Sequence, residues 1–173
     1  MLAILKIIQS IFKTLHSEGT PRQVAAGMAL GACIGLTPLL NLHNLAIISL
    51  IALLNVSFGG GMLGIALFTP LGFALDPIFH RVGLGLLNSP GLRSMWTVWF
   101  NTPIVPFTNF NNSVVLGSFV SWLVLAIPIY FLARWGIARY RATIGDMVRR
   151  SKLYQAVTAS KLYNLYRLFD PES

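Results

Sequence analysis

The feature that most constrains this chain is the length of its uncharged stretches. No Lys or Arg occurs from Val24 to Phe79, and no charged residue of either sign occurs from Phe110 to Ala133. Charged residues make up 10% of the sequence and hydrophobic residues 55%, whereas an ordinary soluble domain carries about 25% charged residues. Lipid hydrocarbon tolerates such an apolar surface because it needs no hydrogen bonds. We therefore expect an all-α integral membrane protein.

Positive charge is concentrated at one end of the chain. The net charge is +8, and eight of the 13 Lys and Arg residues lie between Arg134 and Arg167. A basic tail on an apolar body is typical of a cytoplasmic segment beside anionic lipid, and it argues against nucleic-acid binding. We expect a multi-pass protein of the bacterial inner membrane with both termini in the cytoplasm. The expected lipid contacts are Arg134, Arg139, Arg141, Arg149, Arg150 and Lys152.

Hydrophobic periodicity divides the chain into three regions. Residues 1–18 form an amphipathic pattern that predicts an interfacial helix, with lysines opposite the apolar face. Residues 20–134 form the predicted transmembrane domain. Residues 135–173 form a basic cytoplasmic tail that includes an amphipathic helix.

The transmembrane region opens with two short apolar helices. Thr20-Pro21-Arg22-Gln23 has the pattern of a capping box and predicts a helix as far as about Leu36. Thr37-Pro38 breaks that helix, and a second one is predicted from about Leu39 to Leu54. Each is shorter than the roughly 20 residues of a full crossing, which favours a re-entrant hairpin. The alternative is that both helices cross by tilt or local thinning of the bilayer.

Three further segments follow. A membrane segment is predicted over residues 60–87, apolar as far as Phe79, with a loop region from Arg81 to Arg93. A short aromatic helix is predicted over Leu92–Asn101. Phe110–Arg134 is the strongest candidate for a spanning helix.

Two turns resemble each other. Thr37 to Leu45 aligns without gaps to Thr102 to Phe110, and each segment lies between two apolar helices. We therefore expect two Pro-broken hairpin repeats, over residues 20–56 and 92–134, whose breaks meet in a polar cleft. The alternative is that each turn satisfies its own backbone, with Asn side chains capping the next helix. The expected cleft residues are Thr37, Pro38, Asn41, His43, Asn44, Asn101, Thr102, Pro103 and Asn109.

Small and ionisable residues suggest further roles. Glycines at four-residue spacing predict close helix packing within the hairpin, since small residues let backbones approach; they are Gly27, Gly31, Gly35, Gly60 and Gly64. Asp76 and His80 stand one turn apart and could line an ionisable pathway. Alternatively, Asp76 caps a helix and His80 lies at the interface. No metal-ligand cluster or catalytic constellation can be assembled, so we expect no metal, no cofactor and no enzyme.

The region from Arg22 to Val82 resembles a known family. The matching runs are Val24 to Gly31, Ile34 to Pro38, Asn41-Leu42-His43 and Leu54-Asn55-Val56. They are similar to the bacterial membrane domain-of-unknown-function family numbered twenty sixty-two. Its small branch is often paired with a large AsmA-like protein, and such proteins resemble bridge-shaped lipid carriers between two membranes. The resemblance implies a periplasmic AsmA-like partner and membrane lipid as ligand.

Together with the apolar composition, the resemblance implies a non-enzymatic inner-membrane component of phospholipid transport, which presents lipid to that partner. One alternative is a membrane scaffold or assembly factor. A second is a small-solute or ion transporter, which would need Asp76 or His43 in the cleft.

Overall fold

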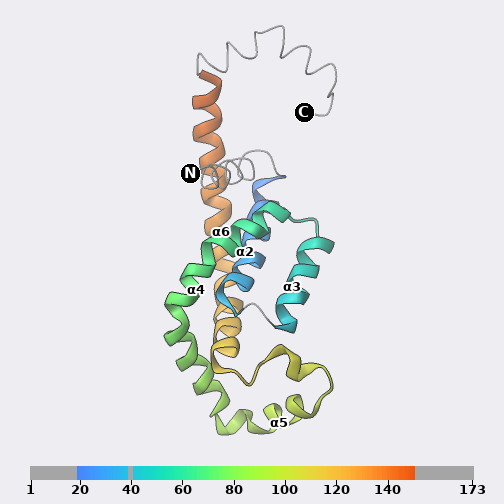
Figure 1. Cartoon of the computed structure of the whole chain (residues 1–173). Helices are drawn as coiled ribbons and strands as arrows, with labels where there is room; N and C mark the ends of the chain where they lie inside the picture. Colours follow the sequence, from blue (N-terminus) through green and yellow to red (C-terminus); the bar gives the residue numbers. More distant parts are fainter. Residues whose placement is uncertain (1–18, 39–40, 151–173) are drawn as a thin grey trace, which may run out of the picture. The chain divides into compact units, whose positions relative to one another are not determined.

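The structure, a computed structural model, describes residues 19–38 and 41–150, with side chains as far as residue 143. This part is all-helical (Figure 1), as expected. The chain divides into two compact units, residues 1–137 and 138–173, and the packing below is that of the first. The expected helices at the two ends of the chain lie outside the described residues. The elements are α2 (Pro21–Leu36), α3 (Leu42–Leu53), α4 (Phe58–Leu87), η1 (Pro90–Leu92), α5 (Arg93–Asn101), η2 (Val105–Thr108) and α6 (Ser113–Arg150).

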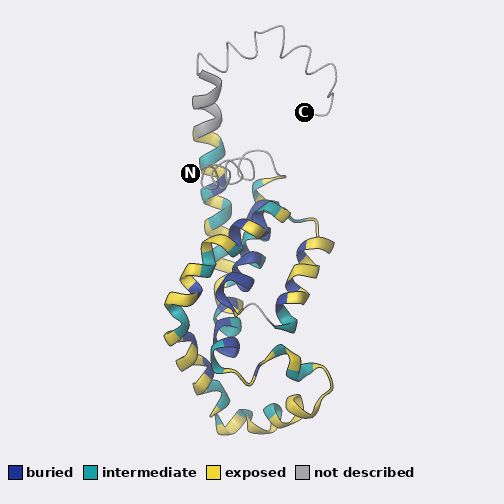
Figure 2. Cartoon of the chain, viewed as in Figure 1, coloured by how far each residue is buried: buried dark blue, intermediate teal, exposed yellow. Residues whose placement is uncertain are grey.

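Helix α2 forms the centre of the core. It begins with the predicted capping box, in which the Gln23 backbone N–H donates to the Thr20 hydroxyl and the Thr20 N–H donates to Gln23 Oε1. It ends at Thr37, whose backbone is extended (φ −103°, ψ 150°) because Pro38 disfavours a helical conformation before it. Most α2 residues are buried, while α3 and α4 are largely exposed (Figure 2).

Glycines bring α2 and α4 into backbone contact. A Cβ atom added to Gly31 would lie 2.0 Å from the carbonyl oxygen of Gly61, and one added to Gly64 would lie 2.4 Å from that of Met28. Gly27, Gly35 and Gly60 meet backbone atoms of the facing helix in the same way. The predicted close packing is therefore present.

The expected partner of these glycines was wrong. The glycine face of α2 packs on α4, not on α3, because α4 carries glycines opposite it and α3 has none. Side chains hold α3 away from α2, and only Asn44, Ile47 and Ile51 of α3 are buried. The glycine face of α2 thus packs on α4 rather than on its hairpin partner α3.

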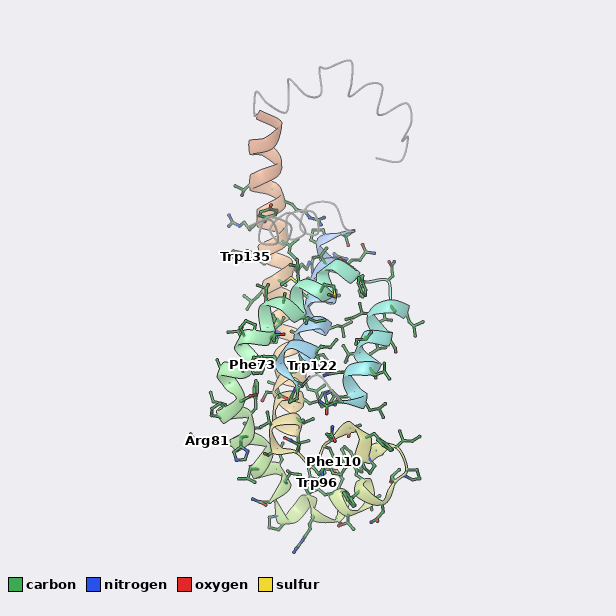
Figure 3. The ribbon with its side chains drawn as sticks, viewed as in Figure 1. Phe73, Arg81, Trp96, Phe110, Trp122 and Trp135 are labelled. Carbon is green, nitrogen blue, oxygen red and sulfur yellow. The ribbon has the colours of Figure 1, made fainter. Side chains whose placement is uncertain are left out.

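A second glycine contact joins α4 to α6. A Cβ atom on Gly117 would lie 1.9 Å from the carbonyl oxygen of Phe79, and one on Gly83 would lie 1.8 Å from that of Ser113. Trp122 of α6 lies in the core (Figure 3), and its indole N–H donates to the carbonyl of Ala29 in α2 at 2.8 Å. Helices α4 and α6 therefore both pack against α2 and against each other.

Two expected boundaries differ from the structure. Helix α4 continues to Leu87, so the predicted loop from Arg81 is wrong. The reason is that Phe79 and Gly83 pack on α6, which keeps the chain helical beyond Pro77. Asp76 is consequently inside a helix and caps none. Helix α6 likewise runs past Arg134 to Arg150 without a break.

Helices α4 and α6 are long and apolar enough to cross a membrane by length and composition. Their most apolar windows have mean hydropathies of 1.7 and 2.2, and only 22% and 28% of those residues are buried. Exposed side chains on the two helices include Leu67, Phe73, Ile127 and Leu132. A core helix of a soluble protein would instead be mostly buried.

We expect Gly31→Ala to destabilise the fold by about 3 kcal/mol or more, because its methyl group would meet a backbone carbonyl that no side-chain rotation can move. Thermal unfolding of the purified protein in detergent measures this. Gly85→Ala is the matched control, since a Cβ atom there meets nothing within 4 Å and alanine favours helix. Equal melting temperatures for the two variants would contradict the backbone contact.

Candidate functional site

The first proline turn satisfies its own buried polar groups. The Thr37 hydroxyl lies 2.8 Å from Asn44 Oδ1 and 2.7 Å from the carbonyl oxygen of Cys33. Asn44 Nδ2 donates to the Pro38 carbonyl at 2.9 Å, and Asn41 Nδ2 donates to the same oxygen. Thr37 and Asn44 are only 4% and 2% exposed. These hydrogen bonds satisfy the polar groups that the interruption of the helix at Thr37–Pro38 would otherwise leave unpaired in the core.

The second proline turn has a different structure. Ile104 has a positive φ of 79°, a conformation unusual for a β-branched residue. Asn109 is left-handed (φ 55°) and ends η2, so α6 begins only at Ser113. Asn112, not Asn109, caps α6, and its Oδ1 accepts from the backbone N–H of Val114 at 2.9 Å. The expected repeat of two matching hairpins is therefore not confirmed.

The two turns nevertheless meet. Asn109 Nδ2 donates to Asn41 Oδ1 at 2.8 Å, although the residues are 68 positions apart. The ring of His43 packs on Phe119, with ring centroids 5.0 Å apart, and lines one cavity together with Thr108 of the second turn. The contact between the breaks is made by a pair of asparagines and by His43.

Three of the expected cleft residues stay outside this contact. Asn101 donates to the carbonyl of Thr97, and Thr102 donates to the carbonyl of Val98, both within α5. Pro103 is exposed and lines neither of the cavities at the two turns. The reason is that α5 satisfies its own last turn, which leaves these side chains exposed.

Instead of one polar cleft, the two turns border separate, mainly apolar cavities that share no lining residue, and Asn101 lines a third cavity beside α5. The larger has a volume of about 420 Å³, and the second about 320 Å³. The larger is lined by Ile34, Gly35, Leu36, Thr37, Pro38, Thr69, Gly72, Phe73 and Asp76. The second is lined by His43, Trp99, Val105, Thr108, Phe110, Val115, Leu116 and Phe119.

Asp76 and His80 do not form one site. Asp76 lines the larger cavity and makes no hydrogen bond or ion pair with any residue that the structure describes. His80 Nδ1 lies 2.6 Å from the hydroxyl of Ser113 and ties α4 to the start of α6. Thr37, Pro38 and Asp76 of this lining were singled out from the sequence, whereas Thr69 and Phe73 were missed. Thr69, Phe73 and Asp76 recur at three- and four-residue spacing, which places them on one helix face.

An aromatic cluster borders the second cavity. Trp96 stacks on Phe110 with ring centroids 5.8 Å apart (Figure 3), and Trp99 meets the same ring edge-on. The Trp96 indole N–H donates to the carbonyl of Leu86 at 3.0 Å. These contacts hold α5 and the second turn against the end of α4.

The remaining candidates play other parts. Cys33 is fully buried in the core and packs among apolar side chains. Arg134, Arg139 and Arg141 lie along α6, whereas the side chains of Arg149 and Arg150, and the whole of Lys152, lie outside the described part. Among the described side chains, no group of three His, Cys, Asp or Glu residues could hold a metal ion.

The fold and site define an all-helical protein with two long apolar helices around a proline-broken hairpin. The model of the family "Uncharacterized protein conserved in bacteria (DUF2062)" matches residues 6–143, so the chain belongs to that family and the resemblance seen in the sequence is confirmed. The chain is 23% identical over 159 residues to an "Uncharacterized protein" of Treponema pallidum (strain Nichols), covering 92% of this chain and 98% of the relative. No solved structure matches.

We expect Asn44→Ala to lower the free energy of unfolding by about 1–3 kcal/mol, because it leaves the Thr37 hydroxyl and the Pro38 carbonyl without this partner in the core. Unfolding in detergent, followed by circular dichroism, measures the loss. Asn101→Ala should stay within about 0.5 kcal/mol of wild type, since Asn101 is exposed and bonds only within α5. A loss of the same size in both variants would show that burial of the network contributes nothing.

Proposed function

We propose that this protein spans the bacterial inner membrane, with α4 and α6 crossing it and α2–α3 entering and leaving on one side. The exposed apolar surfaces of α4 and α6 support this, because they need hydrocarbon around them. Helices α2 and α3, of 16 and 12 residues, are shorter than the roughly 20 residues of a crossing.

Contacts at the two ends of the hairpin support its re-entrant path. Where it begins, Gln23 Nε2 donates to Asn55 Oδ1 at 2.9 Å, and the Gln23 carbonyl accepts from the Ser57 N–H at 3.1 Å. The start of α2 therefore lies beside the end of α3. At the other end, Gly35 and Leu36 lie against Gly72, about halfway along α4. The hairpin turn thus reaches the middle of the proposed span and returns.

This arrangement predicts the topology. With α4 crossing once and α6 crossing back, both termini lie in the cytoplasm, where the basic end of α6 satisfies the positive-inside bias. The loop between α3 and α4 is then cytoplasmic, and α5 is periplasmic.

Cysteine labelling tests this topology in a Cys33→Ala background. A membrane-impermeant maleimide should label Ser94→Cys in intact spheroplasts, because Ser94 is exposed at the start of α5. Leu54→Cys, in the loop after α3, should react only after the membrane is permeabilised. The reverse pattern would contradict the proposed orientation, and labelling of both would contradict the crossing by α4.

We further propose that the protein is a non-enzymatic component of phospholipid transport that presents lipid to a periplasmic AsmA-like partner. The observation that carries this proposal is the cavity of about 420 Å³ at the hairpin turn. Cavities of this size with an apolar lining and a few polar groups are typical of sites for small amphiphilic ligands. Family resemblance supplies the partner, which a pull-down with the full chain would test.

A second candidate function is transport of a small solute or ion. Asp76 lines the larger cavity, which is the placement such a transporter would need. A scaffold, in contrast, would need no cavity of this kind. Lipid transport, solute transport and a scaffold role therefore predict different effects on lipid traffic when the cavity lining is changed.

Pulse-labelling of phospholipid in cells depleted of the protein separates these functions. Depletion should slow the arrival of new phospholipid in the outer membrane, and Phe73→Ala, which alters the cavity lining, should restore transport only partly. Phe131→Ala is the matched control: it removes an exposed aromatic ring from α6, and Phe131 lines none of the described cavities. Unchanged lipid traffic on depletion would favour the solute transporter. Full rescue by both variants would favour the scaffold.

A further inference from the structure

Asp76 carries the only carboxylate among the side chains that the structure describes. It is half-buried in the interior of α4, where the rise of the helix places it about 27 Å from Phe58 and about 16 Å from Leu87. The sequence has no Lys or Arg between Val24 and Phe79. An ionised carboxylate in such surroundings is costly unless a positive group answers it.

The cavity around Asp76 offers hydrogen-bond acceptors and hardly any donors. The Thr69 hydroxyl donates to the carbonyl of Ile65 at 2.7 Å, and the Thr37 hydroxyl proton is used toward Asn44 or Cys33. Their oxygens remain able to accept. Pro77 has no N–H, so the carbonyl of Phe73 lacks its helical partner and adds one more acceptor.

A lining that offers one carboxylate and few hydrogen-bond donors favours a positively charged group that donates hydrogen bonds. A headgroup whose only charge is a phosphate or a carboxylate would find no positive group among the lining residues and would be repelled by Asp76. A primary ammonium carries one positive charge and three donors with no acceptor, which complements the lining. A quaternary ammonium has no N–H to donate and is recognised by cages of several aromatic rings, whereas Phe73 is the only aromatic residue here.

The surface beside the cavity indicates that the ligand is a lipid. Phe73 lines the cavity and is 74% exposed, so the cavity borders apolar surface of α4 at this ring. This apolar surface offers a place for acyl chains, while the cavity takes the headgroup. A free amine would gain nothing from it.

We propose that the larger cavity binds the primary ammonium group of an ethanolamine phospholipid, with Asp76 as its counter-ion and the acyl chains along α4. The inference rests on the proposed role in lipid transport and adds to it the class of headgroup. The protein would then hold an ethanolamine headgroup about halfway through the proposed span.

Lipid retention measures this selectivity. The full-length protein is reconstituted with equal amounts of phosphatidylethanolamine and phosphatidylglycerol, re-extracted in mild detergent, and its retained lipids are counted by native mass spectrometry. Wild type should be enriched in phosphatidylethanolamine, and Asp76→Asn should reduce that enrichment about tenfold, the worth of one charged hydrogen bond. Asp76→Glu should keep most of it. His80→Gln, one turn along α4 but bonded to Ser113, is the matched control and should leave it unchanged.

Each result decides between the two proposals. Equal retention of both lipids by wild type, or unchanged enrichment in Asp76→Asn, would overturn the headgroup assignment and leave the transport role standing. Failure of wild type to retain any phospholipid would overturn both. If Asp76→Asn does not fold, a photoreactive residue at Phe73 should still crosslink phosphatidylethanolamine in wild-type background, and crosslinking of phosphatidylglycerol alone would overturn the assignment. The same group placed at Phe131 of α6 should crosslink both lipids without preference.

Discussion

The direct contact of the α2 and α4 backbones is the interaction on which the rest of the structure depends. Where Gly31 lies on Gly61, no side chain separates the two helices. That contact fixes how far α2 extends along α4, and so places the Thr37–Pro38 turn beside Gly72 and Asp76. An interface made only by side chains would define that register less sharply, because side chains can repack at modest cost whereas two backbones in contact cannot.

Local signals in the sequence predicted local structure well. The capping box at Thr20 and the break at Thr37 depend on neighbours within a few residues, so both could be read directly. The glycine spacing predicted that another helix packs closely on α2. It could not show which helix, because glycines on one face indicate a close contact without identifying the segment that makes it. The length of α4 was underestimated because contacts with α6 keep Pro77 within a helix, and those contacts link residues far apart in the chain.

In the candidate site, the polar residues of the two turns could be identified from the sequence, whereas the path of the backbone through each turn could not. Asn41 and Asn109 were recognised as available polar groups, and the structure joins them. The predicted single polar cleft failed because the first turn closes on itself through Asn44, while the second is lengthened by Ile104 and Asn109 in positive-φ conformations. Pro106 stands where the first turn has Asn41, so a gapless alignment could not reveal that the next helix begins later.

The closed network of Thr37, Pro38 and Asn44 also bears on how the chain is assembled. All three partners lie within eight consecutive residues, so the turn can satisfy its polar groups as soon as this segment leaves the ribosome. Nothing later in the sequence is required for that step. The glycine face of α2, in contrast, stays uncovered until α4 has been made. Because α4 supplies the backbone that covers this face, the turn depends on local sequence whereas the packing of α2 depends on a segment more than 20 residues further along the chain.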